Sequence, residues 1–263
     1  MQQNIPEEQE QPDGPEEPQG EEGDQGDDEP EWCLRECESH GYFRGIDCPI
    51  CSQEGKFLMS EQEIDRLGRV MAGILRHFPE RFNVKMDTHG WVDIQDLVTA
   101  VRQSRDRMRW LRRHHIHAMA LTDEKGRYQV DGERVRATYG HSIDLDLDLP
   151  TDQIPELLYY PAAEEEADLI LDGGLKPSDR KNVHLSRTYR DAAIAGSFRG
   201  GGNPVILQID TRTARKEGMV IKRAGKTVFL SGEVSPKYLA RAPVQEVDLD
   251  GPGEGDGGGE PQN

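Results

Sequence analysis

The sequence predicts an α+β protein in which a winged-helix-like helical lobe precedes a strand-rich lobe. Apolar residues recur at intervals of three and four between residues 60 and 120, which is the period of amphipathic helices. An Asp131-Gly132 hairpin signal closes this region. After Pro150, short apolar runs alternate with short helical patterns, as in α+β lobes.

The two ends of the chain hold most of its negative charge. Residues 1–31 contain 13 acidic residues and residues 244–263 contain 6, with no Lys or Arg in either segment. Both have too few apolar side chains to form a core, so both are predicted to be disordered tails. The body, residues 32–243, carries 31 acidic and 32 basic residues. The folded part therefore does not repel nucleic acid, although the whole chain has a net charge of −18.

Neither a membrane segment nor a secretory leader is recognisable. No run reaches the 18 or so apolar residues of a membrane span, and no basic-then-apolar segment opens the chain. We expect a cytoplasmic protein, monomeric and without a membrane partner.

Residues 32–58 are predicted to form a zinc knuckle. Their cysteines are spaced as Cys33-x3-Cys37 and Cys48-x2-Cys51, and these four are all the cysteines of the chain. Four thiolates at such spacing are typical of a closed, structural zinc site, and so short a segment has little core without a metal. Four unbound thiols are the alternative, and His40 is a possible replacement for one cysteine.

The lobe predicted over residues 60–149 begins with a helix. Ser60 and Glu63 form a capping-box pattern. The predicted inward stripe comprises Leu67, Val70, Met71, Ile74, Leu75 and Phe78. Arg76 and His77 lie off this stripe near the helix end. They are either cations that complement the helix dipole or parts of a phosphate site.

Two further helices are predicted in this lobe, over Asp93–Val101 and from about Asp106 to Ala120. The latter carries many basic residues, among them Arg109, Arg112 and Arg113. We interpret these three arginines as an RNA-binding surface that tracks phosphates, and the alternative is a solvated basic face.

A hairpin over residues 128–137 completes the predicted winged-helix lobe and delivers Arg136 and the turn Gly140-His141-Ser142. Asp144, Asp146 and Asp148 then alternate with leucines. A calcium site would use such acids, but a period-2 strand that leads into a linker at Pro150 fits the alternation better.

The lobe predicted over residues 150–243 holds short strands and helices. Strands are expected at 157–160, 182–186, 204–210, 219–221 and 227–230, and helices at 164–171 and 188–195. Glycine-rich dinucleotide and P-loop motifs are both missing, so a nucleotide would not be bound in either of those ways.

In order and spacing, residues 60–240 resemble the NAD-dependent RNA 2′-phosphotransferases. The resemblance rests on Leu75-Arg76-His77, Val135-Arg136-Ala137, Gly140-His141-Ser142, Gly173-Gly174-Leu175, Val183-His184-Leu185-Ser186, Arg199 before Pro204-Val205, and Thr227-Val228-Phe229-Leu230-Ser231. The family fold is a winged-helix-like lobe joined to an ADP-ribosyltransferase-like lobe. The acidic tail and the knuckle lie outside its common core.

The resemblance implies a two-step reaction on 2′-phosphorylated RNA, with tRNA as a candidate substrate. The 2′-phosphate attacks NAD+ and expels nicotinamide, which gives a 2′-phospho-ADP-ribosyl RNA. The adjacent ribose hydroxyl then takes the phosphate, which leaves 2′-OH RNA and ADP-ribose 1″,2″-cyclic phosphate. The implied catalytic residues are Arg76, His77, Arg136 and Arg199. The implied NAD-pocket residues are Tyr159, Tyr160, His184 and Ser186, while His141 and Ser142 are assigned to RNA binding.

One segment departs from the family pattern. The family usually has Leu-Tyr-His-Gly-Thr where this chain has Leu158-Tyr159-Tyr160-Pro161-Ala162, and Pro161 removes a backbone donor. An RNA-binding protein with weak or lost turnover is therefore one alternative. An ADP-ribosyltransferase acting on other phosphorylated ends or on protein is another. Glu233 is the only plausible catalytic acid for the protein-directed reaction, and that reaction leaves Arg76-His77 unexplained.

Overall fold

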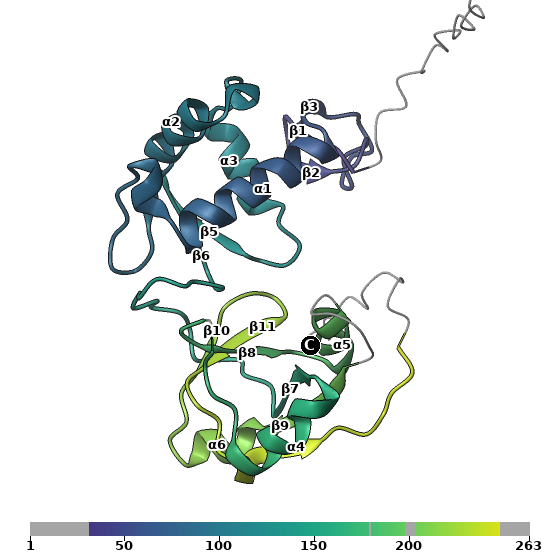
Figure 1. Ribbon diagram of the computed structural model, residues 1–263. Helices are drawn as coiled ribbons and strands as arrows, with labels where there is room; N and C mark the ends of the chain where they lie inside the picture. The colour runs from purple at the N-terminus through teal and green to yellow at the C-terminus, as the bar shows by residue number, and fades with distance from the viewer. Residues whose placement is uncertain (1–31, 179, 198–203, 248–263) are drawn as a thin grey trace, which may run out of the picture.

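The computed structural model describes residues 32–178, 180–197 and 204–247, and it arranges them as two lobes (Figure 1). The amino-terminal lobe contains the helices α1 to α3 and the strands β1 to β6, and the carboxy-terminal lobe contains the strands β7 to β12 and the helices α4 to α6. Mixed helix and antiparallel sheet confirm the predicted α+β class. The predicted tail over residues 1–31 lies outside the described residues, and so do residues 248–263 of the predicted tail over residues 244–263. Residues 244–247 are described, and Val247 packs against the apolar cluster of Ala192, Ala193 and Ile206.

The first lobe opens with a small antiparallel sheet of order β2-β1-β3, comprising β1 (Leu34–Cys37), β2 (Gly41–Arg44) and β3 (Lys56–Met59). This module does not stand alone. Leu34 and Met59 are fully buried in the same apolar core as the helices, and Arg44 donates from Nε to the carbonyl oxygen of Thr122 at 3.0 Å. The knuckle and the helices therefore share one core.

Helix α1 (Glu61–Arg76) begins as predicted, with Ser60 as N-cap and a complete capping box with Glu63. Helix α2 (Ile94–Ser104) is capped by the Asp93 carboxylate. Strands β4 (Val92–Asp93), β5 (Tyr128–Asp131) and β6 (Arg134–Ala137) form a sheet of order β4-β6-β5, which confirms the hairpin.

The predicted third helix was too long. Residues 106–108 form the 3-10 turn η2 (Asp106–Met108), and α3 starts only at Arg113 and ends at Leu121. Arg112 explains the break, because its Nη1 donates to the carbonyl oxygens of Arg109, Trp110 and Leu111. In a continuous helix these carbonyls would accept from backbone N–H groups, but here they accept from the Arg112 side chain. The helix therefore does not run through residues 109–112.

Phe78 also departs from the prediction. It lies beyond the end of α1, just before the 3-10 turn η1 (Pro79–Phe82), and its side chain is 39% exposed. Leu67, Met71, Ile74 and Leu75 are fully buried, as predicted.

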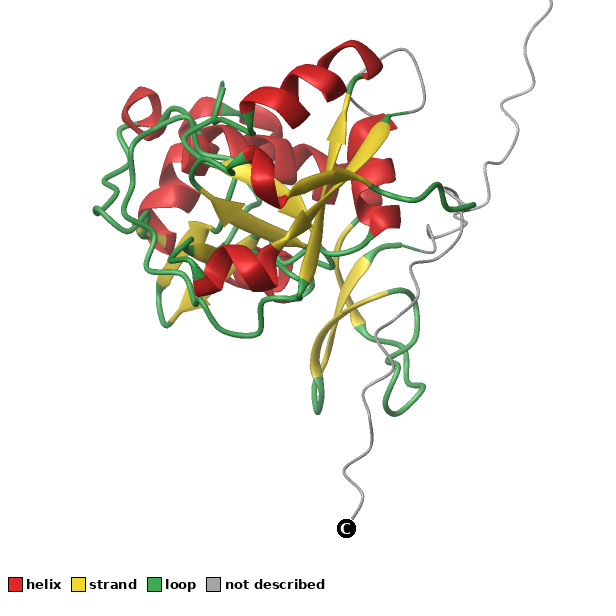
Figure 2. Ribbon diagram, turned by 90° about the horizontal axis from the view of Figure 1, so that it is seen from below, coloured by secondary structure: helices red, strands yellow, loops and turns green. Residues whose placement is uncertain are grey.

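The second lobe is built on a six-stranded sheet of order β10-β11-β8-β7-β9-β12, in which neighbouring strands are antiparallel. The strands are β7 (Leu157–Ala162), β8 (Val183–Ser186), β9 (Val205–Asp210), β10 (Ile221–Arg223), β11 (Val228–Ser231) and β12 (Leu239–Arg241). The helices are α4 (Glu164–Gly173), α5 (Tyr189–Ser197) and α6 (Thr211–Lys216), with a 3-10 turn η3 (Pro236–Tyr238). Viewed from below, the strands lie among these helices (Figure 2). Neither α6 nor β12 was predicted.

Residues 144–149 connect the lobes and pair with no described sheet, so the strand predicted there does not form. The predicted alternation still holds. Leu147 and Leu149 are buried against Ala224 and Leu230 of the second lobe, whereas Asp146 and Asp148 are exposed.

Candidate functional site

The carboxyl end of α1 and the turn at residues 140–142 form one unit at the boundary of the lobes. The backbone N–H of Ser142 donates to the carbonyl oxygen of Arg76 at 3.1 Å. A second hydrogen bond of 3.0 Å joins His77 Nδ1 and Ser142 Oγ. Arg76, His77 and Ser142, which the sequence assigned to one site, are therefore brought together.

Gly140 allows the turn to approach Arg76 closely. Its φ is +85°, a conformation that side chains disfavour, and a Cβ there would lie 3.1 to 3.3 Å from Nη1, Cδ and Cζ of Arg76. The guanidinium also lies 5.0 Å from the centroid of the Tyr139 ring. The arginine fork is thus packed between the glycine backbone and an aromatic ring.

This packing leaves polar nitrogens buried without hydrogen-bond partners. Among the described residues, Nε and Nη2 of Arg76 and Nε2 of His141 are buried and have none. Leaving such donors unsatisfied costs about 1–3 kcal/mol each, and more when the group is charged. A bound phosphate would supply acceptors for the two guanidinium nitrogens of Arg76.

The electrostatics point to the same ligand. Burial, with the nearby groups Arg76, His77 and Arg136, lowers the pKa of His141 to about 4. Burial likewise lowers the pKa of His77, with additional effects from Arg76 and Arg180. The causes of both shifts include only cations besides burial, so the cluster is an electropositive site that a phosphate would neutralise.

Arg136 is held beside this cluster by its own set of partners. Its side chain is 4% exposed, stacks 4.4 Å from the Trp91 ring and forms an ion pair with Asp148. Its Nε donates to Gln129 Oε1 at 2.9 Å, and its Nη1 donates to the carbonyl oxygen of His89 at 3.1 Å. The Arg136 side chain, predicted to be catalytic, is therefore fixed by partners within the chain, and Asp148 already pairs with its guanidinium.

His184 connects the second lobe to the turn. The backbone N–H of Gly140 donates to His184 Nε2 at 3.2 Å, so Nε2 must lack a proton. The proton then resides on Nδ1, which donates to the carbonyl oxygen of Asn182 at 3.0 Å. The imidazole is thereby fixed in one neutral tautomer at the lobe boundary.

The other predicted NAD residues lie on two faces of the large sheet. Tyr159 and Ser186 are paired across β7 and β8, so they share a face with His184. Tyr160 points to the opposite face and packs against the apolar clusters there. A pocket lined by both tyrosines is not what the structure shows, because successive side chains of a strand alternate.

Pro161 is accommodated in β7. The pairing of β7 with β8 is recorded only at Tyr159, and Pro161 faces Ile206 of β9 on the other side. A Cβ on Gly196 of α5 would lie 2.8 Å from Pro161 Cβ, so helix and proline pack closely.

Arg199, the fourth predicted catalytic residue, lies outside the described residues. Arg180 was not predicted, yet its charge acts on both Arg76 and His77. Only its place shortly before the Val183–Ser186 motif was a signal for it. Of the predicted RNA-binding arginines, Arg113 forms an ion pair with Glu133. The Arg112 side chain donates to backbone carbonyls of the three residues that precede it. Arg109 lies apart from the Arg76 site, in a shallow hollow with Thr99 and Arg102.

The metal-ligand groups brought together differ from the predicted set. Ligand atoms of Cys37, His40, Cys48 and Cys51 lie within 4.8 Å of one another. Cys33 lies outside this group; its thiol donates to the carbonyl oxygen of Gly45 at 3.3 Å and accepts from Arg35 Nε at 3.2 Å. His40 thus takes the place expected for Cys33.

The distances in this group fit zinc. His40 Nδ1 lies 3.5 Å from Sγ of both Cys37 and Cys48, and the sulfurs of Cys37 and Cys51 are 3.7 Å apart. A tetrahedron with ordinary zinc bonds has S–N edges of about 3.6 Å and S–S edges of about 3.8 Å. The pKa of Cys48 is lowered to about 6, because backbone N–H groups of Cys51 and Ile50 and neighbouring thiols outweigh the effect of burial.

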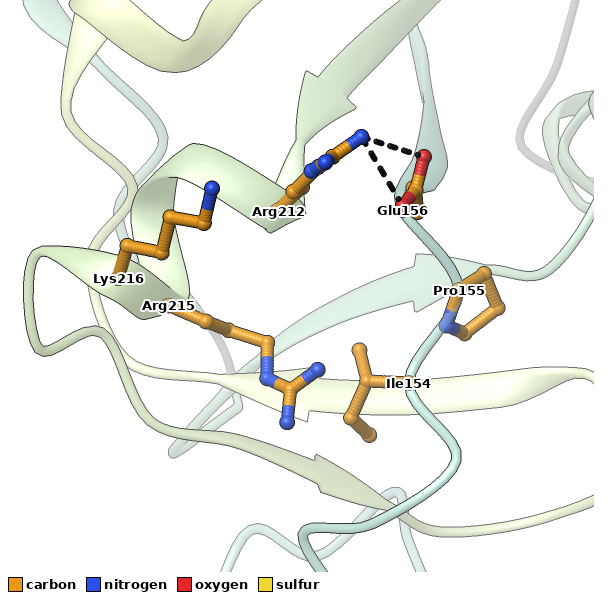
Figure 3. Close-up of a pocket in the computed structure, with 6 residues that line it drawn as sticks. All are labelled: Ile154, Pro155, Glu156, Arg212, Arg215 and Lys216. Carbon is orange, nitrogen blue, oxygen red and sulfur yellow. Dashed lines mark hydrogen bonds and ion pairs between the residues drawn. The ribbon is translucent and has the colours of Figure 1, made fainter.

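A hollow of about 400 Å³ lies elsewhere, beside α6 (Figure 3). Its lining residues are Ile154, Pro155, Glu156, Arg212, Arg215 and Lys216. Arg212 is neutralised there by Glu156, and no predicted site residue lines it. Across the described residues, no helix is long and apolar enough to cross a membrane.

Comparison with known proteins identifies the family of the chain. The model of the RNA 2′-phosphotransferase family (Tpt1 / KptA) matches residues 62–233, which include Arg76, His77 and the 140–142 turn. The chain belongs to the RNA 2′-phosphotransferase family. It is 44% identical over 217 residues to a probable RNA 2′-phosphotransferase of Thermoplasma acidophilum, with 82% of this chain and 91% of the relative covered.

Other members of this RNA 2′-phosphotransferase family are nearly as similar. A probable RNA 2′-phosphotransferase of Methanosarcina barkeri is 41% identical, covering 78% of this chain and 97% of its own length. One from Haloarcula marismortui is 33% identical, with 79% and 96% covered. The family's enzymes remove the 2′-phosphate from RNA and use NAD+ as co-substrate.

Proposed function

We propose that this chain removes the 2′-phosphate from RNA by transferring it to NAD+. One observation carries the proposal: in a member of this family, buried nitrogens of Arg76 and His141 at the lobe boundary have no hydrogen-bond partner. A bound phosphate would supply acceptors to the guanidinium. The products are 2′-OH RNA, nicotinamide and ADP-ribose 1″,2″-cyclic phosphate.

Arg76 and His141 hold the 2′-phosphate in this proposal. The phosphate is already an anion and needs no strong base to attack the nicotinamide-bearing ribose carbon. The site must instead orient one oxygen and support the charge as nicotinamide leaves. The packed fork of Arg76 suits this task because its donors are fixed before the substrate arrives.

His77 and Arg136 serve the second transfer, together with Arg199. In that step the ribose 2″-hydroxyl attacks phosphorus and loses its proton, and the RNA 2′-oxygen leaves and gains one. His77 is neutral near pH 7 because its pKa is lowered, so it is able to accept a proton. Ser142 orients its imidazole. Arg136, which is paired with Asp148, contributes a guanidinium next to this site.

The second lobe supplies the NAD+ surface. Tyr159, His184 and Ser186 share one face of the large sheet. The hydrogen bond from the Gly140 N–H to His184 joins this face to the Gly140 turn. We accordingly assign residues 150–243 to an ADP-ribosyltransferase-like lobe and residues 60–149 to a winged-helix RNA-binding lobe.

A zinc ion held by Cys37, His40, Cys48 and Cys51 completes the proposal. All four positions of a tetrahedron are then taken by protein ligands, which leaves none for catalysis. The ion stabilises the β1–β3 module and, through the shared core, the lobe that carries Arg76.

A single-turnover assay tests the proposed reaction. An oligoribonucleotide with one internal 2′-phosphate is incubated with the protein, with and without NAD+. Loss of the phosphate only with NAD+, and release of one nicotinamide per phosphate, is the expected result. Tight RNA binding without phosphate loss would instead identify an RNA-binding protein that has lost turnover.

A further inference from the structure

Phe78 is an exposed aromatic residue directly beside the phosphate site. Its ring belongs to none of the described apolar clusters and is 39% exposed. The chain turns there because Pro79, itself buried, starts η1, while the backbone N–H of Phe78 donates to the carbonyl oxygen of Gly73 at 3.0 Å. The ring therefore leaves the α1 core stripe and points to solvent, although its position in the sequence suggested burial.

A guanidinium and an imidazole lie near this ring. The guanidinium carbon of Arg81 is 4.1 Å from the ring centroid, and the His77 ring is 5.7 Å away. The backbone N–H of Arg81 donates to the carbonyl oxygen of Phe78 at 3.2 Å, but among the described residues its side chain forms no ion pair or hydrogen bond, although Glu80 is its neighbour in sequence. The surface beside the Arg76 site thus carries an exposed phenyl ring and an arginine side chain without an acidic partner among the described residues.

We propose that Phe78 and Arg81 form a stacking platform for an unpaired RNA base next to the 2′-phosphorylated nucleotide. The inference rests on the proposed function and adds a subsite to it. Proteins bind single-stranded RNA by stacking splayed bases on aromatic rings and arginine planes. Phe78 directly follows His77, and their rings are 5.7 Å apart. A base next to the bound phosphate would therefore lie close to the Phe78 ring.

The platform belongs to RNA rather than to NAD+. Phe78 and Arg81 lie at the carboxyl end of α1 in the first lobe, whereas the face with Tyr159 and Ser186 lies in the second. The positive charge of Arg81 also suits the phosphodiester of the neighbouring nucleotide. Binding of the base is thus separable from binding of the dinucleotide.

The test compares three variants in RNA binding and in single turnover. Phe78→Ala removes the ring, Phe78→Trp keeps an aromatic surface, and Phe57→Ala removes an equally exposed phenyl ring on β3, where it is 44% exposed. We expect Phe78→Ala to weaken binding of the 2′-phosphorylated RNA about 5- to 100-fold, the range for loss of one base stack. Phe78→Trp and Phe57→Ala should bind as the unaltered protein does, and the KM for NAD+ should stay unchanged in all three.

Abasic RNAs locate the stacked base. Removal of the base on one side of the 2′-phosphorylated nucleotide should reproduce the loss seen with Phe78→Ala, and combining the two changes should cost nothing further. Equal affinities of Phe78→Ala and Phe57→Ala for RNA would overturn the inference, as would a rise only in the KM for NAD+. If the unaltered protein removes no phosphate, the proposed reaction fails instead, and the RNA affinities still report on the platform.

Discussion

At the scale of single residues, the site depends on side chains that are fixed before substrate binds. Arg76 is packed between Gly140 and Tyr139, and His184 is fixed by two hydrogen bonds of opposite direction. Such order lowers the entropy lost when the phosphate is bound. It also means that small changes near Arg76 should affect turnover more than folding.

Gly140→Ala tests this dependence. The added Cβ would strain a φ of +85° and press on the Arg76 guanidinium, so we expect about 1–2 kcal/mol of destabilisation and a 10- to 100-fold slower single turnover. Gly132→Ala is the matched control, because Gly132 has a φ of +57° but open space around its Cβ position. It should lose similar stability and keep its rate; equal loss of rate in both would contradict the packing argument.

Buried histidines should make stability depend on pH. Burial lowers the pKa of His115 and His141 to about 4 in the folded protein, below the usual 6.5 of an unfolded chain. The unfolded state binds more protons between these values, so stability should fall as pH drops from about 6.5 to 4, by about 3 kcal/mol per histidine.

His115→Asn isolates one of these contributions. His115 Nδ1 accepts from the Arg112 backbone N–H at 2.9 Å, and an amide oxygen is able to replace that acceptor without titrating. Urea unfolding at several pH values should show a shallower dependence for the variant. An unchanged slope would show that His115 does not carry the effect.

At the scale of elements, local signals predicted what local interactions determine. The Ser60–Glu63 capping box and the apolar stripe of α1 were recognisable because both arise within a few residues. The start of α3 was not, because the Arg112 side chain satisfies carbonyls that a helix would otherwise use. The direction of Phe78 likewise depends on the turn at Pro79 and not on helical period.

The metal module shows the same limit for sites. Cysteine spacing predicted the module, but spacing alone does not decide which four of five candidate side chains converge. The hydrogen bonds of Cys33 with Gly45 and Arg35 hold its sulfur apart from the others, and the β1–β2 turn brings in His40.

Metal analysis of two variants tests the revised ligand set. His40→Ala removes a proposed ligand, so purified protein should contain less than one zinc per chain and melt at a lower temperature. Cys33→Ser should retain one zinc, because that thiol lies outside the group. The reverse pattern would restore the four-cysteine set.

At the scale of the whole molecule, the segment from Tyr139 to Leu149 joins the lobes and carries part of the site. It contains the Gly140 turn, the Asp148 partner of Arg136, and the leucines that pack on the second lobe. The family resemblance indicated that residues of both lobes converge, but only the fold shows that this segment fixes their distance.

Leu147→Ala should therefore affect both folding and activity. Leu147 is 6% exposed between the lobes, and truncating a buried leucine costs about 2–5 kcal/mol. We expect calorimetry to show a lower melting temperature and turnover to slow, because the Gly140–His184 contact is loosened. Leu169→Ala, at a position that is 73% exposed, is the control and should behave as the unaltered protein.

The most direct test of the central claim, that the Arg76 fork holds the transferred phosphate, is single turnover with Arg76→Lys at saturating RNA and NAD+. Lysine keeps the charge and loses the fork, so we expect the rate to fall on the order of 10²–10³-fold while the protein stays folded. Arg69→Lys, on the exposed side of the same helix, should keep the full rate. An unimpaired rate with Arg76→Lys would contradict the account and place the phosphate elsewhere.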